Sequence, residues 1–582
     1  MLSDPISLAI VQNAFTTTAQ EMGLSVVRSA YSTVVKEGGD ATSAIFDGRG
    51  RLVAQSVGAP LMHLSSLRPS LAELLRDFPA EDMREGDVFA FNDPYRGGIH
   101  SNDVMLFRPV CLGGRVEFFT AALLHVADIG GIAAGGLPAN ATEMYHEGLI
   151  LPPVPIQRAG EPQRDVLNII AANSRTPEKV LGDIRAMLAG VNVGARRIGG
   201  LAQRYGVERL GELCSELMDY SELRTRQEIG KLPAGTQRGE FLIDDDGVET
   251  GKDHRVQVEL EIGRDSIRAD FSGSDPQARG PINAARSQSM SGVLFAVRCF
   301  LDPEIPVNEG VYRPLEVELP YGTLVNPRPP AACNARMATV MAIVEAILQA
   351  FAGVAPHKAV AASCNAHVYT LDGVDRETGK VWTYLDPQFG GGGARSDRDG
   401  LDVTAPLIFG GGSVAGTVEA YEIEYPVRFR RFELWRDSGG AGRWRGGLGT
   451  RRELEVLDDV RLTARATDRC RIPPPGIRGG RPGAGGGWIV NQDEADERVL
   501  PPKITAHELR RGERLTMLTS AGGGCGEPWE RDPRRVLEDV REGRVSVEAA
   551  RRDYGVAIDR RTLALLDDDT RRLRAERSAP EP

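Results

Sequence analysis

Two apolar segments joined by a glycine pair constrain the fold of this chain more than any other feature. Residues 104–110 and 116–126 are almost continuously apolar, and they meet at Gly113-Gly114. Short apolar runs bounded by turn residues are typical of buried β-strands. Residues 41–55 also predict a β-hairpin, because two strand-like runs flank the turn sequence DGRG. We therefore expect a β-sheet in the N-terminal part of the chain.

Helical and strand-like patterns alternate along the rest of the chain. Residues 5–27, 174–230 and 334–356 predict helices, the last of them long and apolar. Residues 236–330 predict mostly strands and turns. This mixture indicates a mixed α/β (α+β) fold, with β-hairpins and glycine-rich loops around a candidate metal site.

The length of 582 residues exceeds what one hydrophobic core usually supports, so we expect several domains. Shifts in composition indicate four regions: an α/β region with the candidate site (1–235), a β-rich region followed by a long helix (236–383), a glycine-rich β region (384–527) and a charged helical tail (528–582). Glycine runs occur at 390–393, 410–412, 485–487 and 522–524. Because none of them matches the phosphate-binding motif G-x-x-x-x-G-K-[ST], we predict structural turns there and no ATP site.

Charge and cysteine content exclude several classes of function. The formal net charge is −11, so nothing electrostatic favours nucleic acid as a partner. No apolar run approaches the ~20 residues of a membrane span, and the acidic N-terminus is unlike a signal peptide. Seven cysteines without a C-x-x-C motif indicate a reducing compartment and no disulfide framework. We expect a cytoplasmic protein that binds neither membrane nor nucleic acid.

An H-x-x-D pattern occurs near the outer end of each apolar segment. His100 and Asp103 precede the first segment, and His125 and Asp128 lie at the end of the second. Asp40 stands where the first strand of the predicted hairpin begins. Imidazole nitrogens and carboxylate oxygens are typical ligands of catalytic Zn²⁺, Mn²⁺ or Fe²⁺. Because the connection between the two patterns is about a strand long, we expect the wider fold, rather than a short hairpin, to bring them together.

A structural interpretation of the same residues stays open. H-x-x-D arises by chance in a long chain, and an aspartate before glycine often just closes a turn. Glycine pairs beside both patterns favour a ligand site slightly, because glycine permits close approach of the backbone. His146-Glu147 begins like H-E-x-x-H but lacks the second histidine, which excludes a zincin. Glu147 is therefore either a pocket acid or a surface acid.

Several long motifs follow one another along nearly the whole chain: KEGGDATSAIFD, FNDPYRGGIHSNDV, LLHVADIGG, EMYHEGLILPPVPI, DSGGAGRWRGGLG and GGGCGEPWERDPRRVLEDV. In these motifs the sequence resembles the hydantoinase B/5-oxoprolinase family, the B subunits of N-methylhydantoinase-type enzymes. The resemblance implies an ATP-dependent hydrolase that opens cyclic amides such as hydantoins, 5-oxoproline and other lactams. It also implies that ATP is bound by a separate A-type subunit, in a hetero-oligomer of A2B2 type.

The resemblance further implies a divalent metal in the B-type chain, with Mn or Zn as the first candidates and Fe as the third. Carried over residue by residue, the implied ligands are Asp40, His100, Asp103 and His125. The two residues after Asp40 depart from the family, which has an aromatic residue and a serine there. This departure concerns the shape of the pocket rather than the ligand set.

On this basis we hypothesise that an A-type partner phosphorylates the amide oxygen, and that this chain performs the metal-assisted attack of water. Asp128 is then a candidate general base, or an acceptor for the ring N–H of a ligand histidine. His63 and Glu147 are candidates for the lining of the pocket. Two alternatives are a component of an ATP-dependent ketone carboxylase, which the resemblance also covers, and a metal-free scaffold that only supports the A-type partner.

Overall fold

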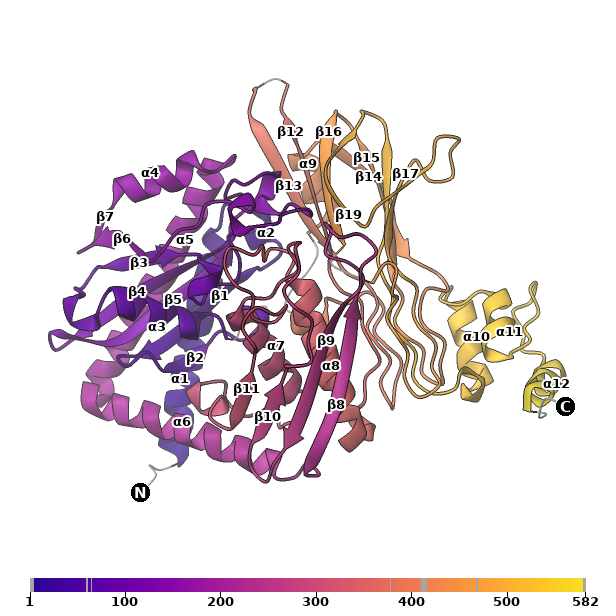
Figure 1. Ribbon diagram of the computed structural model, residues 1–582, viewed down its shortest axis with the longest axis horizontal. Helices are drawn as coiled ribbons and strands as arrows, with labels where there is room; N and C mark the ends of the chain where they lie inside the picture. The colour runs from indigo at the N-terminus through magenta and orange to yellow at the C-terminus, as the bar shows by residue number, and fades with distance from the viewer. Residues whose placement is uncertain are drawn as a thin grey trace.

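Figure 1 shows the computed structural model of the chain, which describes residues 5–58, 61–63, 65–376, 378–409, 416–466 and 469–578. Helices pack against four β-sheets within these residues, which confirms the predicted mixed α/β class. The glycine run at 410–412 and the end of the tail at 579–582 lie outside the described residues.

The first sheet forms the N-terminal part of the molecule. Its strands follow in the order β2 (Leu52–Gln55), β1 (Ala41–Asp47), β5 (Arg115–His125), β4 (Asp103–Leu112), β3 (Val88–Phe91), β6 (Val154–Arg158) and β7 (Glu161–Pro162). Each strand is antiparallel to its neighbours. The predicted hairpin is present as β1 and β2, and the two apolar segments form β4 and β5.

Helices cover both faces of this sheet. They are α1 (Pro5–Ser29), α2 (Thr33–Lys36), α3 (Leu67–Asp77), α4 (Arg164–Ala172), α5 (Pro177–Tyr205) and α6 (Val207–Ile229). On one face, Val26 of α1 and Ile184 of α5 pack in a buried cluster with Leu124 of β5. On the other face, Leu71 of α3 packs with Phe107 of β4. Burial on both faces explains why these strands are continuously apolar instead of alternating.

A second sheet and two helices form the centre of the molecule. The strands follow in the order β11 (Leu315–Glu318), β10 (Ile267–Asp270), β9 (His254–Ile262) and β8 (Gly235–Ile243), and the helices are α7 (Arg286–Arg298) and α8 (Met337–Val354). By length and composition alone α8 could cross a membrane, which corrects our expectation that no run comes close. However, 78% of this helix is buried inside the protein, where Ile347 packs with Val258 of β9.

The last two sheets pack face to face. One contains β13 (Val381–Gln388), β12 (His367–Val374), β16 (Val460–Ala466) and β19 (Lys503–Leu509), and the other β14 (Val427–Leu434), β15 (Thr450–Val456), β20 (Arg514–Leu518), β17 (Gly487–Val490) and β18 (Arg498–Leu500). Tyr369 and Leu462 from the first of these sheets share a buried cluster with Leu454 and Trp488 from the second. The boundary that we predicted between 383 and 384 falls inside β13, and the division of the chain into four regions stays a prediction.

The described glycine runs form no turns, which corrects our prediction, and apart from Gly487 their residues pack against neighbouring segments. The amide of Gly447 donates to the carbonyl of Gly392 at 2.8 Å, and the amide of Gly522 donates to Gly447 at 2.9 Å. A Cβ atom on Gly447 or Gly522 would lie only 1.9 Å from a neighbouring carbonyl oxygen. Only glycine permits this spacing, so these residues are required by backbone packing.

The helical tail lies at the far end of the molecule from the first sheet (Figure 1). It contains α10 (Pro533–Arg541), α11 (Val547–Tyr554) and α12 (Asp567–Ser578), while α9 (Val418–Glu424) precedes β14. Just before α10, Arg531 pairs with Asp399 at 2.6 Å and with Asp539 at 2.7 Å. The pair with Asp399 joins the tail to the glycine-rich part of the chain, and the pair with Asp539 lies within the tail.

Candidate metal centre

The register of the first sheet places three of the predicted ligands in one row. Asp103 at the start of β4 lies directly opposite His125 at the end of β5. On the other side of β5, the amide of His125 donates to the carbonyl of Asp40 at 3.3 Å, just before β1 begins. Residues directly opposite each other in antiparallel strands project to the same face. A long hairpin with its turn at Gly113-Gly114 thus joins the two H-x-x-D patterns, contrary to our expectation.

A tight turn brings His100 to the same place. Its carbonyl accepts a hydrogen bond from the amide of Asp103 at 3.0 Å, which folds the chain back just before β4. Upstream, Asp93 accepts a hydrogen bond from the amide of Tyr95, and Gly97 has a φ of 88°. A Cβ atom on Gly97 would lie 2.5 Å from the amide nitrogen of Ser70 on α3. The glycine therefore lets this turn press against α3 and fixes the position of His100.

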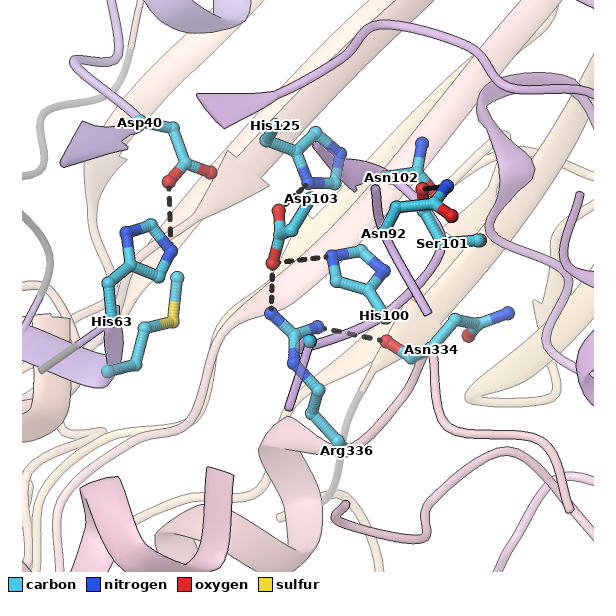
Figure 2. Close-up of polar contacts among 12 residues, drawn as sticks. Asp40, His63, Asn92, His100, Ser101, Asn102, Asp103, His125, Asn334 and Arg336 are labelled. Atoms are coloured by element: carbon cyan, nitrogen blue, oxygen red, sulfur yellow. Dashed lines mark hydrogen bonds and ion pairs between the residues drawn. The ribbon is translucent and has the colours of Figure 1, made fainter. Parts of the chain in front are cut away.

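His100, Asp103 and His125 form a buried trio around one carboxylate (Figure 2). Nδ1 of His125 lies 3.1 Å from Oδ1 of Asp103, and Nε2 of His100 lies 3.2 Å from Oδ2. One ligand atom from each residue lies within 4.8 Å of the other two. All three side chains are buried. This spacing allows a single cation to contact all three residues.

The unpaired atoms of the trio fit a metal ion. Both ring nitrogens of His100 and Nε2 of His125 are buried without a hydrogen-bond partner. The 3.2 Å approach of His100 to Asp103 is thus an electrostatic contact rather than an aligned hydrogen bond. Buried polar atoms in proteins nearly always have a partner, so several orphaned nitrogens in one place call for an explanation. A divalent cation would use imidazole lone pairs of this kind.

The protonation states of the trio also suit metal binding. Burial lowers the pKa of His100 well below its usual range, and the guanidinium of Arg336 lowers it further. Burial alone would raise the pKa of Asp103, but contacts with His100, His125 and Arg336 outweigh it and hold that pKa well below its usual range. A neutral imidazole and an ionised carboxylate are the forms that bind metals.

Asp40 and His63 lie together beside the trio (Figure 2). Nε2 of His63 is 3.7 Å from Oδ1 of Asp40, and both atoms lack a hydrogen-bond partner. Nδ1 of His63 is held by Oγ1 of Thr42 at 2.9 Å, which aims the opposite edge of the ring toward Asp40. Asp40 lies outside the compact trio, and its role as the fourth ligand stays a prediction.

Asp128 lies in a network of hydrogen bonds with the loop that follows β5. Its carboxylate accepts hydrogen bonds from the amides of Gly130, Gly135 and Arg175, and from the Arg175 guanidinium at 3.0 Å. No histidine nitrogen is among its partners in the described part of the chain. The residue lies past the end of β5. Asp128 therefore stabilises the loop after β5, and its role as a general base stays a prediction.

Glu147 is a buried carboxyl group that contacts the chain just before Arg336. It is fully buried, and Oε1 accepts hydrogen bonds from the amides of Cys333 at 2.7 Å and Asn334 at 2.8 Å. Burial raises the pKa of Glu147 to about 8, although those two N–H donors oppose the shift. Glu147 is thus neither a surface acid nor part of the described lining of the cavity, and His63 is likewise absent from that lining.

A small cavity of about 70 Å³ opens beside the trio. His100, His125 and Asp40 line one side, and apolar side chains line most of the remainder, including Met62, Phe389 and Phe409. The cavity therefore lies between the first sheet, which carries candidate ligands, and the third sheet, which contains β13, β12, β16 and β19. Such a mostly apolar cavity with a few convergent polar groups is the usual form of a small-molecule site.

Two arginines in this cavity were missed in the sequence. Arg336, just before α8, donates to Oδ2 of Asp103 at 3.3 Å, and Arg465 of β16 lies across the cavity. Asn334 links them, because its carbonyl accepts hydrogen bonds from both guanidinium groups. The one sequence signal for Arg336 was a single basic residue directly before a long apolar helix. For Arg465 the sequence offers no comparable signal.

Comparisons with known proteins identify the family of this chain. The family described as hydantoinase B/oxoprolinase matches residues 4–528. The chain is 33% identical to the beta chain of the caprolactamase of Pseudomonas jessenii. It is 31% identical to a protein named as the B component of a putative D-/L-hydantoinase from a Pseudomonas species. The alignments cover 96% and 95% of this chain and the same shares of the two relatives.

Solved structures show the same likeness. A chain in the crystal structure of ATP-dependent caprolactamase from Pseudomonas jessenii matches with a TM-score of 0.89 and 31% identity, over 99% of this chain and 100% of that one. A chain of acetone carboxylase matches with a TM-score of 0.90 over 99% of this chain and 83% of that one, but at 19% identity this likeness concerns the fold alone. The chain belongs to the hydantoinase B/oxoprolinase family.

Proposed function

We propose that this chain is the B-type subunit of an ATP-dependent hydrolase of cyclic amides, and that it holds a divalent metal with Asp40, His100, Asp103 and His125. The names of its relatives, components of a caprolactamase and of a hydantoinase, support the reaction class and the need for a partner chain. One observation carries the proposal: the trio places orphaned histidine nitrogens around an ionised carboxylate at the edge of an apolar cavity.

The proposed division of labour follows from the chemistry of amides. An unactivated amide carbonyl is a poor electrophile, and phosphorylation of its oxygen by ATP in an A-type partner would create a leaving group. Water then adds to the carbonyl carbon, and the C–N bond of this adduct breaks as the nitrogen takes up a proton, which leaves an acyl phosphate. A second water molecule hydrolyses the acyl phosphate to a carboxylate and phosphate. The products are an open-chain amino acid, ADP and phosphate.

The residues of the site fit the second half of this reaction. When bound, a divalent metal supplies Lewis-acid chemistry that lowers the pKa of a water molecule toward ~7. Asp103 stays ionised and His100 stays neutral, which keeps their donor atoms available. The apolar lining, with Met62, Phe389 and Phe409, would exclude bulk water and accept the carbon skeleton of a ring.

The test measures metal content and ring opening in the same preparations. Wild-type chain should hold about one Mn, Zn or Fe, and His100→Ala should lose it, as measured by plasma mass spectrometry. His254→Ala is a matched control, because His254 is also buried near an aspartate but has no second histidine. With an A-type partner and ATP, the wild type should open caprolactam or a hydantoin and His100→Ala should not.

Three outcomes would contradict the proposal. Full activity in His100→Ala would favour the metal-free scaffold. Turnover that requires a ketone and bicarbonate, without cyclic amide hydrolysis, would favour the carboxylase. Equal loss of metal in His254→Ala would show that the metal is not bound by the trio.

A further inference from the structure

Arg465 occupies an unusual position in the wall of the cavity. In the third sheet it lies directly opposite Val368 of β12, which in turn lies opposite Pro387 of β13. Opposite residues share a face of an antiparallel sheet, and all three of these residues line the cavity beside the trio. Arg465 is therefore a guanidinium group in an otherwise apolar part of the wall, in the cavity that the candidate ligands Asp40, His100 and His125 also line.

The surroundings of Arg465 contain no carboxylate within ion-pair distance in the described residues. Its Nη1 donates to the side-chain oxygen of Asn334 at 2.7 Å and also to the carbonyl of Asn334. Its Nε is buried without a partner, and the residue is only 4% exposed. Five other arginines are equally buried, and each has a carboxylate within 4.0 Å: Arg336, Arg445, Arg452, Arg469 and Arg531.

The local charge balance makes this exception costly. An unpaired buried cation loses its hydration without compensation, and Arg336 adds like-charge repulsion because Asn334 holds both groups. Arg336 itself is already paired with Asp103. Glu147 is the nearest candidate counter-ion, but with a pKa of about 8 it is largely protonated at neutral pH. Arg336 and Arg465 are thus the two guanidinium groups of the cavity, and Asp40 and Asp103 are the nearby carboxylates, but of the two arginines only Arg336 is in ion-pair contact with one of them.

We propose that Arg465 binds an oxyanion of the reacting molecule, namely the phosphoryl group that enters on the activated amide or the carboxylate that forms when the ring opens. This inference rests on the proposed function for the identity of the reacting molecule. A guanidinium group suits both anions, because its planar fork of N–H donors matches two oxygens at once. The neighbouring apolar wall strengthens such a contact by excluding water.

Calorimetric titration of the purified, metal-loaded chain tests the inference without ATP, cyclic amide or partner. The two probes are inorganic phosphate and 6-aminohexanoate, an open-chain amino acid. Wild type should bind at least one of them in the millimolar range or better. Arg465→Met should weaken that binding by about 10- to 100-fold, and Arg465→Lys should weaken it less. Arg461→Met is the matched control, because Arg461 lies on the same strand but pairs with Asp372.

The two probes separate the two sources of the anion. A loss confined to phosphate assigns the phosphoryl group, and a loss confined to 6-aminohexanoate assigns the carboxylate. Unchanged affinity for both in Arg465→Met, or no binding of either by wild type, overturns the inference. Arg465→Met should also melt no lower than wild type, since replacing an unpaired buried charge by an apolar side chain is often neutral or stabilising.

Failure of the proposed function is a separate result. If the complex opens no cyclic amide while phosphate affinity still depends on Arg465, the anion site stands and the reaction class is wrong. If the complex opens cyclic amides while Arg465→Met binds both anions like wild type, only the inference about Arg465 fails.

Discussion

Nη2 of Arg336 lies 3.3 Å from Oδ2 of Asp103, so the carboxylate at the centre of the trio has a permanent cationic neighbour. Both side chains are almost completely buried. Asp103 also contacts His100 and His125, whose rings surround its two oxygens. Because burial keeps His100 neutral, Arg336 supplies the lasting positive charge at this carboxylate when no metal is bound.

Replacing Arg336 by methionine should make the folding stability of the chain depend on bound metal. Without Arg336 the buried carboxylate of Asp103 lacks a compensating cation, which costs about 3 kcal/mol of folding stability in the metal-free chain. Added metal takes over that role, so it should raise the melting temperature of Arg336→Met more than that of wild type. Arg336→Lys retains the charge and should behave like wild type. Equal metal-induced shifts in all three proteins would contradict this prediction.

His63 should tune the affinity for metal without being essential for it. Its Nε2 faces Asp40 at 3.7 Å, and Thr42 fixes the orientation of the ring. Groups that orient a ligand typically change metal affinity about 10- to 100-fold, so His63→Gln should weaken binding by roughly that factor. The check is a competition titration with a chelator. His146→Gln serves as control, because His146 is partly exposed and lies beside Glu143; an equal loss there would refute a specific role for His63.

The local half of the site follows from the sequence. The glycine turn at 113–114 and the two apolar segments are sufficient to predict a hairpin, and counting residues from its turn places Asp103 opposite Leu124, one residue before His125. A bulge between Val110 and Cys111 shifts that register by one residue, and it has no evident sequence signal. The placement of His100 likewise follows from the glycine-rich turn before β4. Elements close in sequence thus determine the trio.

The other half of the site depends on contacts between distant segments, which a single sequence does not reveal. Arg465 reaches the cavity only because the third sheet packs across the first, and Arg336 reaches it from the head of α8. Asp128 illustrates the converse. Its H-x-x-D spacing matches that of Asp103, yet Arg175, which is 47 residues further along the chain, pairs with its carboxylate. Spacing alone does not distinguish a ligand from a structural ion pair.

Asp128→Asn should destabilise the protein but leave the metal in place. The substitution removes the ion pair with Arg175. It also replaces a carboxylate, both oxygens of which accept from N–H groups, by an amide, in which one of the two groups is an NH2 donor. We expect a loss of about 2 kcal/mol in the free energy of unfolding. Metal content and the pH profile of kcat/KM per folded molecule should be unchanged. A shifted pH profile would instead support Asp128 as a general base. Asp165→Asn, on the exposed surface of α4, is the control.

Glu147 should make stability fall as the pH rises. Its pKa is about 8 in the folded protein because of burial, whereas an unfolded glutamate titrates near 4.5. Between these values the folded state binds a proton that the unfolded state has lost, so the folded state loses about 1.4 kcal/mol of stability per pH unit. Below about pH 5 both states are protonated and the effect disappears.

Glu147→Gln removes this titration while preserving shape, and an amide oxygen can still accept from Cys333 and Asn334. The variant should therefore match wild type near pH 5 and become progressively more stable than wild type up to about pH 8. Denaturant unfolding at several pH values measures the gap. Glu161→Gln on β7, where the side chain is exposed, should show no pH-dependent gap. A constant gap for Glu147→Gln would mean that Glu147 is ionised in the folded protein, and Arg465 would then have a counter-ion of its own.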